Sequence, residues 1–178
     1  MLMLYVIGIP GSGKTSTLYG ALAQSEYKVE PFPFAHEEHS GGIALGRRRE
    51  QFGGTDALSL AVQPKVLKFL AEQRPPVVVG EGDRLATDSF FEGVQSLGYQ
   101  LNLVLMDTPV EVATARVAGR VWNPDGKWLK GRLTKVARLT MLYNPLRIDG
   151  TAPLGRCVAQ LAEHPAIQQL RGKMRVTL

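Results

Sequence analysis

The 178-residue chain has one cysteine, three histidines and few aromatic residues, and it lacks long hydrophobic runs. The single Cys157 excludes an internal disulfide and is typical of a protein from a reducing cytoplasm. No apolar run approaches the ~20 residues that a membrane-spanning helix needs, so we expect no membrane partner. The apolar start of the chain has no basic segment before it, and we interpret it as a core strand rather than a signal peptide.

Ligands for a structural metal are also scarce. The sequence His36-Glu37-Glu38-His39 contains metal-binding residue types but lacks the i, i+4 histidine spacing of a helical zinc site. We therefore predict a solvated or substrate-facing loop there. The length and composition favour one globular domain over residues 1–178.

What the chain has in excess is positive charge, and most of it lies in one segment. The formal net charge is +5. Seven basic residues and one acid fall between Arg116 and Arg138, so this segment accounts for the whole excess. Such a local bias favours a polyanionic partner without proving one.

Residues Gly8–Thr15 read Gly-Ile-Pro-Gly-Ser-Gly-Lys-Thr, a complete Walker A phosphate-binding loop. The apolar run Leu2–Ile7 precedes it, and a helix is expected over Lys14–Ala23. Glycines let successive backbone N–H groups face phosphate oxygens, and the positive end of the helix points at the same anion. Lys14 is expected to reach the β- and γ-phosphates, and Thr15 to ligate Mg²⁺. The predicted nucleotide-binding residues of this loop are Gly8, Pro10, Gly11, Ser12, Gly13, Lys14, Thr15 and Ser16.

Strand-like and helix-like runs alternate along the rest of the chain, which predicts a parallel α/β sheet with helices on both faces. We expect strands at residues 27–34, 77–79, 101–106 and 147–149, with a brief one at 42–46 inside a loop over 41–55. Helices are expected from residue 64 to about 74 and over 88–97, 109–119, 132–142 and 154–164, while 165–178 carries no clear signal. For the fourth helix start, Thr108 is the predicted N-cap, with a capping box to Glu111.

Two carboxylates follow a buried strand at the edge where open α/β sheets bind ligands. Glu81 and Asp83 come directly after the run Val77–Val79. One carboxylate is expected to hold Mg²⁺, and the other to accept the proton of an acceptor hydroxyl. The sequence does not decide which carboxylate has which role. Thr15 and Glu81 are the candidate metal ligands. The alternative is a solvated turn.

A lid is predicted at about residues 120–132. Arg116 and Arg120 are four residues apart on one helix and share a face, and the polar segment Val121–Gly131 follows. Such a segment can close over ATP, exclude water and place guanidinium groups on the transferring phosphoryl group. The alternative is a solvated basic helix. Trp122 and Trp128 are more often packing residues than a base-stacking platform.

The segment Arg47–Asp56 is the candidate acceptor-binding region. Arg47, Arg48 and Arg49 stand beside Phe52 and a Gly-Gly pair, a composition suited to phosphate contacts. Asp56 has two open roles: it either binds the substrate, or it caps the helix expected near residue 57.

These features resemble the P-loop kinases of the nucleoside and nucleotide kinase class. The resemblance covers residues 2–164, with Gly8–Thr15 as its specific part and Gly80–Arg84 as the acidic-arginine element after the third core strand. It implies a three-layer P-loop NTPase fold with about five parallel strands and a lid. ATP and Mg²⁺ are the implied cofactors. It also implies a substrate contact by Arg84 and a late loop, with Asp149 and Thr151, that borders the adenine.

The stretch Arg48–Leu58, with the core Phe-Gly-Gly-Thr-Asp-Ala-Leu, together with Glu81–Arg84, is similar to bacteriophage kinases that phosphorylate 5-hydroxymethyluracil within DNA. That similarity implies a DNA partner, which agrees with the localised basic charge, and a place in the bacterial host cytoplasm. A kinase for a free nucleoside or nucleoside monophosphate is the main alternative. A DNA-stimulated ATPase that transfers no phosphate to an acceptor is the second.

Overall fold

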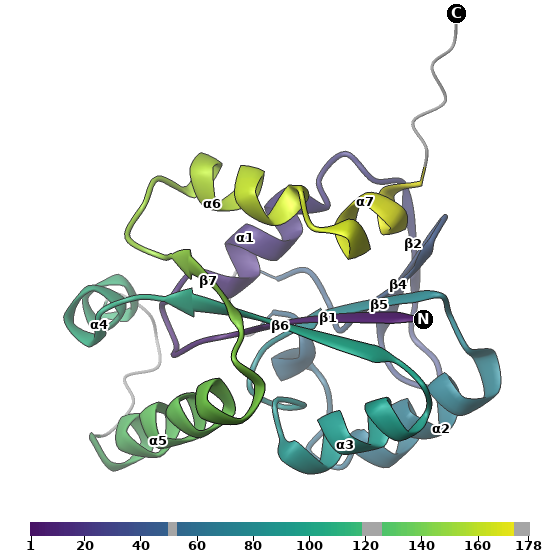
Figure 1. Ribbon diagram of the computed structural model, residues 1–178, viewed down its shortest axis with the longest axis horizontal. Helices are drawn as coiled ribbons and strands as arrows, with labels where there is room; N and C mark the ends of the chain where they lie inside the picture. The colour runs from purple at the N-terminus through teal and green to yellow at the C-terminus, as the bar shows by residue number, and fades with distance from the viewer. Residues whose placement is uncertain (50–52, 119–125, 173–178) are drawn as a thin grey trace, which may run out of the picture.

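The computed structural model describes residues 1–49, 53–118 and 126–172, and it shows a twisted sheet between two layers of helices (Figure 1). The strands are β1 (Leu2–Ile7), β2 (Tyr27–Glu30), β3 (His36–His39), β4 (Gly42–Leu45), β5 (Val77–Glu81), β6 (Gln100–Asp107) and β7 (Leu146–Asp149). The α-helices are α1 (Lys14–Ala21), α2 (Gln63–Gln73), α3 (Asp88–Ser96), α4 (Val110–Val117), α5 (Gly126–Tyr143), α6 (Leu154–Ala162) and α7 (Pro165–Arg171), and η1 (Thr55–Ala57) is a 3₁₀ turn.

The sheet order is β2-β3-β4-β5-β1-β6-β7. The five strands from β4 to β7 in that order are mutually parallel, which confirms the expected parallel sheet. The sheet is larger than predicted, because β2 and β3 extend one edge as antiparallel strands. The carboxyl ends of β1 and β5 lie side by side, so the phosphate-loop sequence and Glu81 leave the sheet at the same edge.

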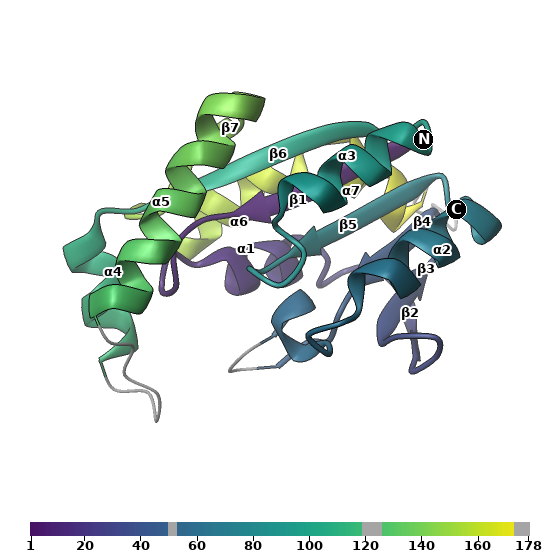
Figure 2. The same ribbon diagram turned by 90° about the horizontal axis from the view of Figure 1, so that it is seen from below.

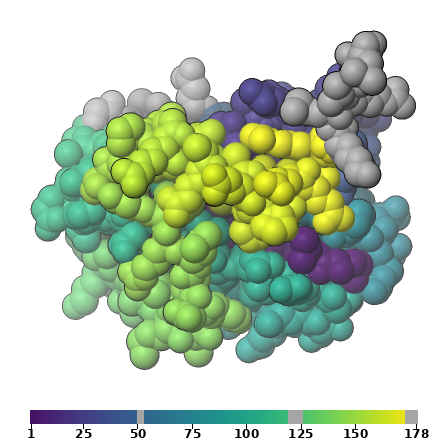
Figure 3. All heavy atoms as spheres, turned by 45° about the horizontal axis from the view of Figure 1, so that its top comes forward, coloured from purple at the N-terminus to yellow at the C-terminus, as the bar shows by residue number. Residues whose placement is uncertain are grey.

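The central strand β1 is buried on both faces, and its side chains alternate between two cores. Met3, Tyr5 and Ile7 pack with α2, α3 and part of α5. Leu4 and Val6 pack with α1, α6 and α7 on the opposite face. Figure 2 shows these two layers from below, and in Figure 3 α6 and α7 form a continuous band across one face. A continuous apolar run is what a strand covered on both faces requires.

Several predicted elements are wrong in detail. Residues 36–39 form β3 instead of a loop, because their backbone pairs with both neighbours and buries His36, Glu37 and His39. The expected strand 27–34 ends at residue 30. Helix α5 begins at residue 126, so the second half of the predicted lid is helical. Helix α7 was not predicted. Among the described residues, no helix is both long and apolar enough to cross a bilayer.

The predicted capping box at Thr108 is also wrong. Pro109 occupies the N-cap position of α4, and no side chain caps this helix. Thr108 is buried, and its hydroxyl donates to the backbone oxygen of Ser12 at 3.1 Å. The residue therefore ties the end of β6 to the phosphate loop rather than starting a helix.

Candidate active site

The phosphate loop has the tight backbone that its glycines predict. Gly8, Gly11 and Gly13 all adopt positive φ angles. A Cβ atom at Gly11 would come within 2.2 Å of the Ala113 backbone oxygen in α4, so only glycine fits there. The loop leads directly into α1, whose first turn contains no acidic residue. Its N-terminal dipole and its backbone N–H groups are therefore suited to a phosphate.

Two polar side chains of this loop lie where the motif requires them. The Lys14 ammonium donates to the backbone oxygens of Gly8 and Ile9 at 2.9 and 3.0 Å and so crosses the loop. The Thr15 hydroxyl donates to Glu81 Oε1 at 2.9 Å. The end of β5 thus meets the start of α1 through a hydroxyl and a carboxylate, both of them hard oxygen donors.

The electrostatic state of Glu81 is unusual for a carboxylate. Its side chain is 1% exposed. Burial raises its pKa to about 7, although the Lys14 cation and the Thr15 hydrogen bond act in the opposite direction and Asp56 adds a further small rise. Burial therefore disfavours the charged form, and a divalent cation beside the carboxylate would favour it.

Opposite the phosphate loop, residues 53–56 pack directly against Glu81. A Cβ atom at Gly54 would lie 2.1 Å from Glu81 Oε1, and Gly54 has a φ of 58°. Thr55 is fully buried, and its hydroxyl donates to the Glu81 backbone oxygen at 2.9 Å. Tyr5 Oη lies 2.8 Å from that hydroxyl and donates to the Gly82 backbone oxygen at 3.0 Å. The Gly-Gly-Thr sequence is thus needed for close approach to the carboxylate.

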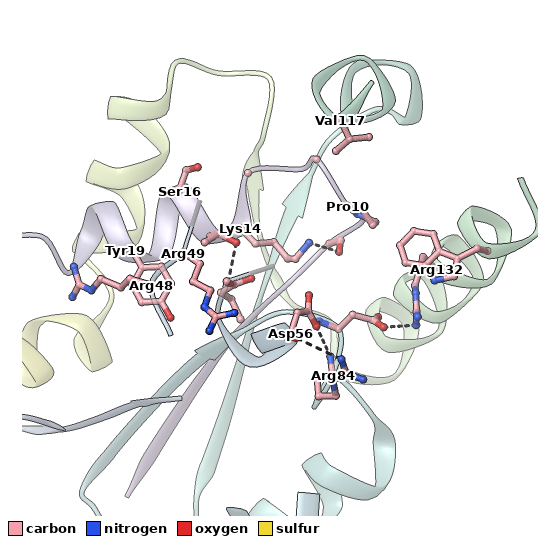
Figure 4. A pocket seen from close by; sticks show the side chains of 18 residues that line it. Pro10, Lys14, Ser16, Tyr19, Arg48, Arg49, Asp56, Arg84, Val117 and Arg132 are labelled. Atoms are coloured by element: carbon pink, nitrogen blue, oxygen red, sulfur yellow. Dashed lines mark hydrogen bonds and ion pairs between the residues drawn. The ribbon is translucent and has the colours of Figure 1, made fainter. Parts of the chain in front are cut away.

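Asp56 does not cap a helix; its side chain binds the turn that follows β5. Its Oδ1 atom accepts hydrogen bonds from the backbone N–H groups of Asp83 and Arg84, at 2.8 and 2.9 Å. The turn η1 has no side-chain cap, so the predicted capping role is wrong. The carboxylate instead joins the Arg47–Asp56 segment to the turn after β5. It lies on the wall of the main cavity (Figure 4).

Asp83 is held by the basic helix. Its carboxylate forms ion pairs with Arg132 and Lys135, the latter at 3.0 Å, and Lys135 also donates to the Asp83 backbone oxygen at 2.8 Å. The Arg132 guanidinium lies 4.7 Å from the centre of the Trp128 ring. Helix α5 is thereby docked onto the turn after β5, and two of the seven clustered cations are partly neutralised.

The three consecutive arginines have three different environments. Arg48 forms a bidentate ion pair with the buried Glu37, with Nε–Oε1 at 2.8 Å, and its guanidinium lies over the rings of Tyr19 and Tyr27. Burial raises the pKa of Glu37, but these contacts and the His39 ring, whose Nε2 lies 3.3 Å from Glu37 Oε2, outweigh it and lower the pKa. Arg49 is exposed at the main cavity. Arg47 lines a different, smaller cavity.

The main cavity has a volume of about 660 Å³. Figure 4 shows Lys14 at its centre, with Tyr19, Arg48 and Arg49 to one side and Arg132 and Val117 to the other. Its lining also includes Gly8, Pro10, Gly11, Gly13, Thr15, Ser16, Gly53, Asp56, Glu81, Asp83, Arg84 and Trp128. Residues from five separate parts of the chain therefore meet at one side of the sheet.

Other predicted site residues lie elsewhere. Arg116 does not line this cavity; it donates to the Gly150 backbone oxygen at 2.9 Å and so ties α4 to the turn after β7. Asp149 accepts from the backbone N–H and hydroxyl of Thr151, and neither residue lines the cavity. Ser12 is fully buried under the loop. The predicted residues Phe52, Arg120 and Trp122 lie outside the described residues.

The sequence did not identify Tyr19, Val117 or Arg132 as cavity residues. Tyr19 lies one helical turn after Thr15, a spacing that places both on one side of α1. Arg132 follows Trp128 at the same spacing on α5. Counting one helical turn onward from Thr15 and from Trp128 would therefore have identified two of these three residues, Tyr19 and Arg132. Among the described residues, no group of three or more His, Cys, Asp or Glu side chains is placed so that it could hold a metal ion by itself.

The parallel sheet, the glycine loop before α1 and the carboxylate at the end of β5 define the P-loop NTPase fold, in the arrangement of its kinases. A family model described as P-loop Nucleotide Kinase3 matches residues 1–177. The chain belongs to this family and is a P-loop kinase.

A solved structure with a similar fold is a sugar kinase from Janibacter sp. HTCC2649 in its unliganded form. It is 15% identical, with a TM-score of 0.52 over 94% of this chain and 98% of that one. At that identity the similarity concerns the fold alone. No curated protein matches the sequence.

Proposed function

We propose that this kinase transfers the γ-phosphate of ATP to the hydroxymethyl group of 5-hydroxymethyluracil in DNA. The observation that carries the proposal is the composition of the cavity wall opposite the phosphate loop. That wall presents the Asp56 carboxylate for a hydroxyl group, the arginines 49 and 84 for phosphate groups, and the stacked pair Trp128–Arg132 for a base. Each of these side chains is of a type that recognises one part of a nucleotide within DNA.

The donor side would be held by the phosphate loop. Its N–H groups and Lys14 would bind the β- and γ-phosphates. The hydroxyl of Thr15 and the carboxylate of Glu81 fit Mg²⁺, because both are oxygen donors and the carboxylate is buried without full charge compensation. When bound, the ion would neutralise charge on the phosphates.

The three carboxylates of the cavity, Glu81, Asp83 and Asp56, differ in their hydrogen-bond and ion-pair partners. Glu81 bonds to Thr15, and Asp83 is paired with two cations. Asp56 has Oδ1 fixed by two backbone N–H groups, and it forms no ion pair with any residue that the structure describes. We assign Asp56 the role of proton acceptor. The acceptor oxygen would attack the γ-phosphorus, the bond to the bridging oxygen of ADP would break, and the hydroxyl proton would pass to Asp56.

A base within a duplex must leave the stack to reach this cavity, because Glu81 and Thr15 lie deep beside the sheet. Enzymes that modify bases extrude the target nucleotide and stack it on aromatic side chains. Trp128 and Arg132 are on α5, which faces the cavity from the side opposite Arg48 and Arg49. The resemblance of Phe52–Asp56 to phage kinases of hydroxymethylated DNA supports the same acceptor.

A free nucleotide is the second candidate, and the arginine environments favour it. Arg48 is engaged by Glu37 and Arg47 faces another cavity, so Arg49 alone among the three is exposed at the main cavity. One guanidinium with Arg84 is enough for a single phosphate. A row of backbone phosphates would require contacts outside this cavity.

The test is transfer of labelled γ-phosphate to a panel of acceptors: DNA with 5-hydroxymethyluracil, unmodified DNA, and the free hydroxymethylated nucleotide. We expect label on the modified DNA only, with an inactive Lys14→Ala enzyme as the blank for contaminating kinases. Rapid transfer to the free nucleotide, with none to DNA, would establish the second candidate instead. ATP hydrolysis without a labelled acceptor would contradict both.

A further inference from the structure

A second, smaller cavity lies on the other side of the segment that forms the acceptor wall. Its volume is about 180 Å³. Pro33, Phe34, Leu58 and Val62 form apolar parts of its lining, and Ser59, Arg47 and Lys65 are its polar and charged members. The sequence pattern predicts that Arg47 contacts the acceptor, but Arg47 lines this small cavity and not the main one.

The electrostatics of this cavity favour an anion. Arg47 and Lys65 are exposed and form no ion pair with any residue that the structure describes. None of the described residues that line the cavity is acidic. Lys65 is in the first turn of the 11-residue helix α2, which has no acidic residue in that turn and no side-chain cap. Two cations, a hydroxyl and an uncapped helix start therefore converge where one phosphate group could be held.

The two cavities are separated by the width of one chain segment. Arg47 and Arg48 are consecutive, as are Asp56 and Ala57, and in each pair one residue lines the small cavity and the other the main one. Arg47 and Gly54 pair as a two-residue antiparallel bridge, with N–O distances of 3.2 and 2.8 Å, so a residue that lines the small cavity is joined to the glycine that packs against Glu81.

An exposed aromatic residue directly precedes a lining residue of the small cavity in the chain. Phe32, the sequence neighbour of Pro33, is 81% exposed. Surfaces that bind single-stranded nucleic acid combine such solvent-exposed rings, which stack on bases, with cations that follow the backbone. A free inorganic anion would make no use of the ring.

We propose that this small cavity is a subsite for a backbone phosphate of the DNA strand, next to the nucleotide whose base enters the main cavity. The proposal rests on the proposed function, since it requires a DNA acceptor. It supplies the phosphate contacts that the main cavity lacks, and it gives Arg47 and Lys65 a shared role.

The experiment is phosphorylation of hydroxymethylated DNA by the double variant Arg47→Gln/Lys65→Gln at several salt concentrations. We expect the KM for DNA to rise about tenfold, and the slope of log(1/KM) against log[salt] to become shallower by about 0.8, as for one lost phosphate contact. The KM for ATP and the kcat at saturating DNA should stay within about twofold, because neither residue touches the donor wall. Phe32→Ser should raise the KM for DNA without changing the slope.

Lys68→Gln is the matched control, since it removes one exposed cation from the same helix outside the cavity. An unchanged KM and slope in the double variant would overturn the subsite and leave the proposed function intact. The same effect in Lys68→Gln would also overturn it, by showing a general charge effect. A wild-type protein that phosphorylates no DNA would remove the proposed function and the subsite together. If the double variant does not fold, each single variant should raise the KM for DNA and make the slope shallower, by no more than about 0.8.

Discussion

The two walls of the main cavity are built in different ways. The donor wall is mainly local: Gly8–Thr15 forms its turn from glycine backbone angles and from hydrogen bonds between residues five or six positions apart, with one long-range bond from Thr108 to Ser12. The acceptor wall depends on contacts between distant parts of the chain. Tyr5 holds Thr55, and Asp56 bonds to the turn after β5, 27 and 28 positions away.

This difference determines how the shape of each wall responds to amino-acid substitutions. A local turn retains its shape wherever its own residues are kept, so the donor wall can serve any ATP-dependent reaction on this fold. A wall assembled from β1, β5, α5 and the 53–56 segment changes when any one of these elements changes. Acceptor specificity should therefore reside in the long-range contacts, and substitutions there should separate the two walls experimentally.

The largest expected effect concerns Asp56. Asp56→Asn retains an oxygen that accepts from the N–H groups of Asp83 and Arg84 but removes the proton acceptor. We expect kcat to fall by about 10²–10⁴-fold while the KM for ATP is kept, as for loss of a general base. Steady-state kinetics with each substrate varied would measure this.

Asp83→Asn is the matched control for Asp56, because it removes a carboxylate that two cations already occupy. We expect a smaller loss of kcat from it, on the order of tenfold or less. A greater loss from Asp83→Asn than from Asp56→Asn would reverse the assignment.

Glu81 stands between the two walls, and its protonation should couple the stability of the protein to pH. Burial raises its pKa to about 7 in the folded protein, above the ordinary value of 4.5, so the folded state binds this proton more tightly than the unfolded state. Its contribution to stability is complete below about pH 4.5 and is lost as pH rises through about 7. The wild type should thus lose on the order of 3 kcal/mol between pH 4.5 and 8 that Glu81→Gln does not lose.

Denaturant unfolding of both proteins in the presence of a chelator would measure this difference. The glutamine variant keeps an oxygen for the Thr15 hydroxyl, so it isolates the charge. Parallel stability curves for the two proteins over that pH range would contradict the account of Glu81.

A smaller effect is expected on the free energy of unfolding, and it should differ between the adjacent residues Arg48 and Arg49. Arg48→Met leaves the buried Glu37 carboxylate without its bidentate partner, and we expect a loss of roughly 3 kcal/mol in the free energy of unfolding. Arg49→Met, at an exposed position, should change it by no more than about 0.5 kcal/mol. Equal losses in the two variants would show that the Glu37–Arg48 pair does not stabilise the acceptor wall.

The sequence predicted the donor wall and the parallel sheet because both depend on short-range patterns. It missed β3, since the charged run at residues 36–39 has no strand-like composition. That strand is possible because Arg48 and His39 compensate the buried Glu37. It missed α7 although Pro165 and Gly172 stand at its two ends. It could not assign the carboxylates, because Arg132 and Lys135 reach Asp83 from about 50 positions away along the chain.

The most direct test of the central claim is where the phosphate goes. Hydroxymethylated DNA incubated with the protein, ATP and Mg²⁺ would be digested to nucleotides without phosphatase and analysed by mass spectrometry. The account predicts that 5-hydroxymethyldeoxyuridine monophosphate is converted into a species heavier by one phosphoryl group, located on the hydroxymethyl oxygen. Digests in which that nucleotide is unchanged while ATP is consumed would contradict it.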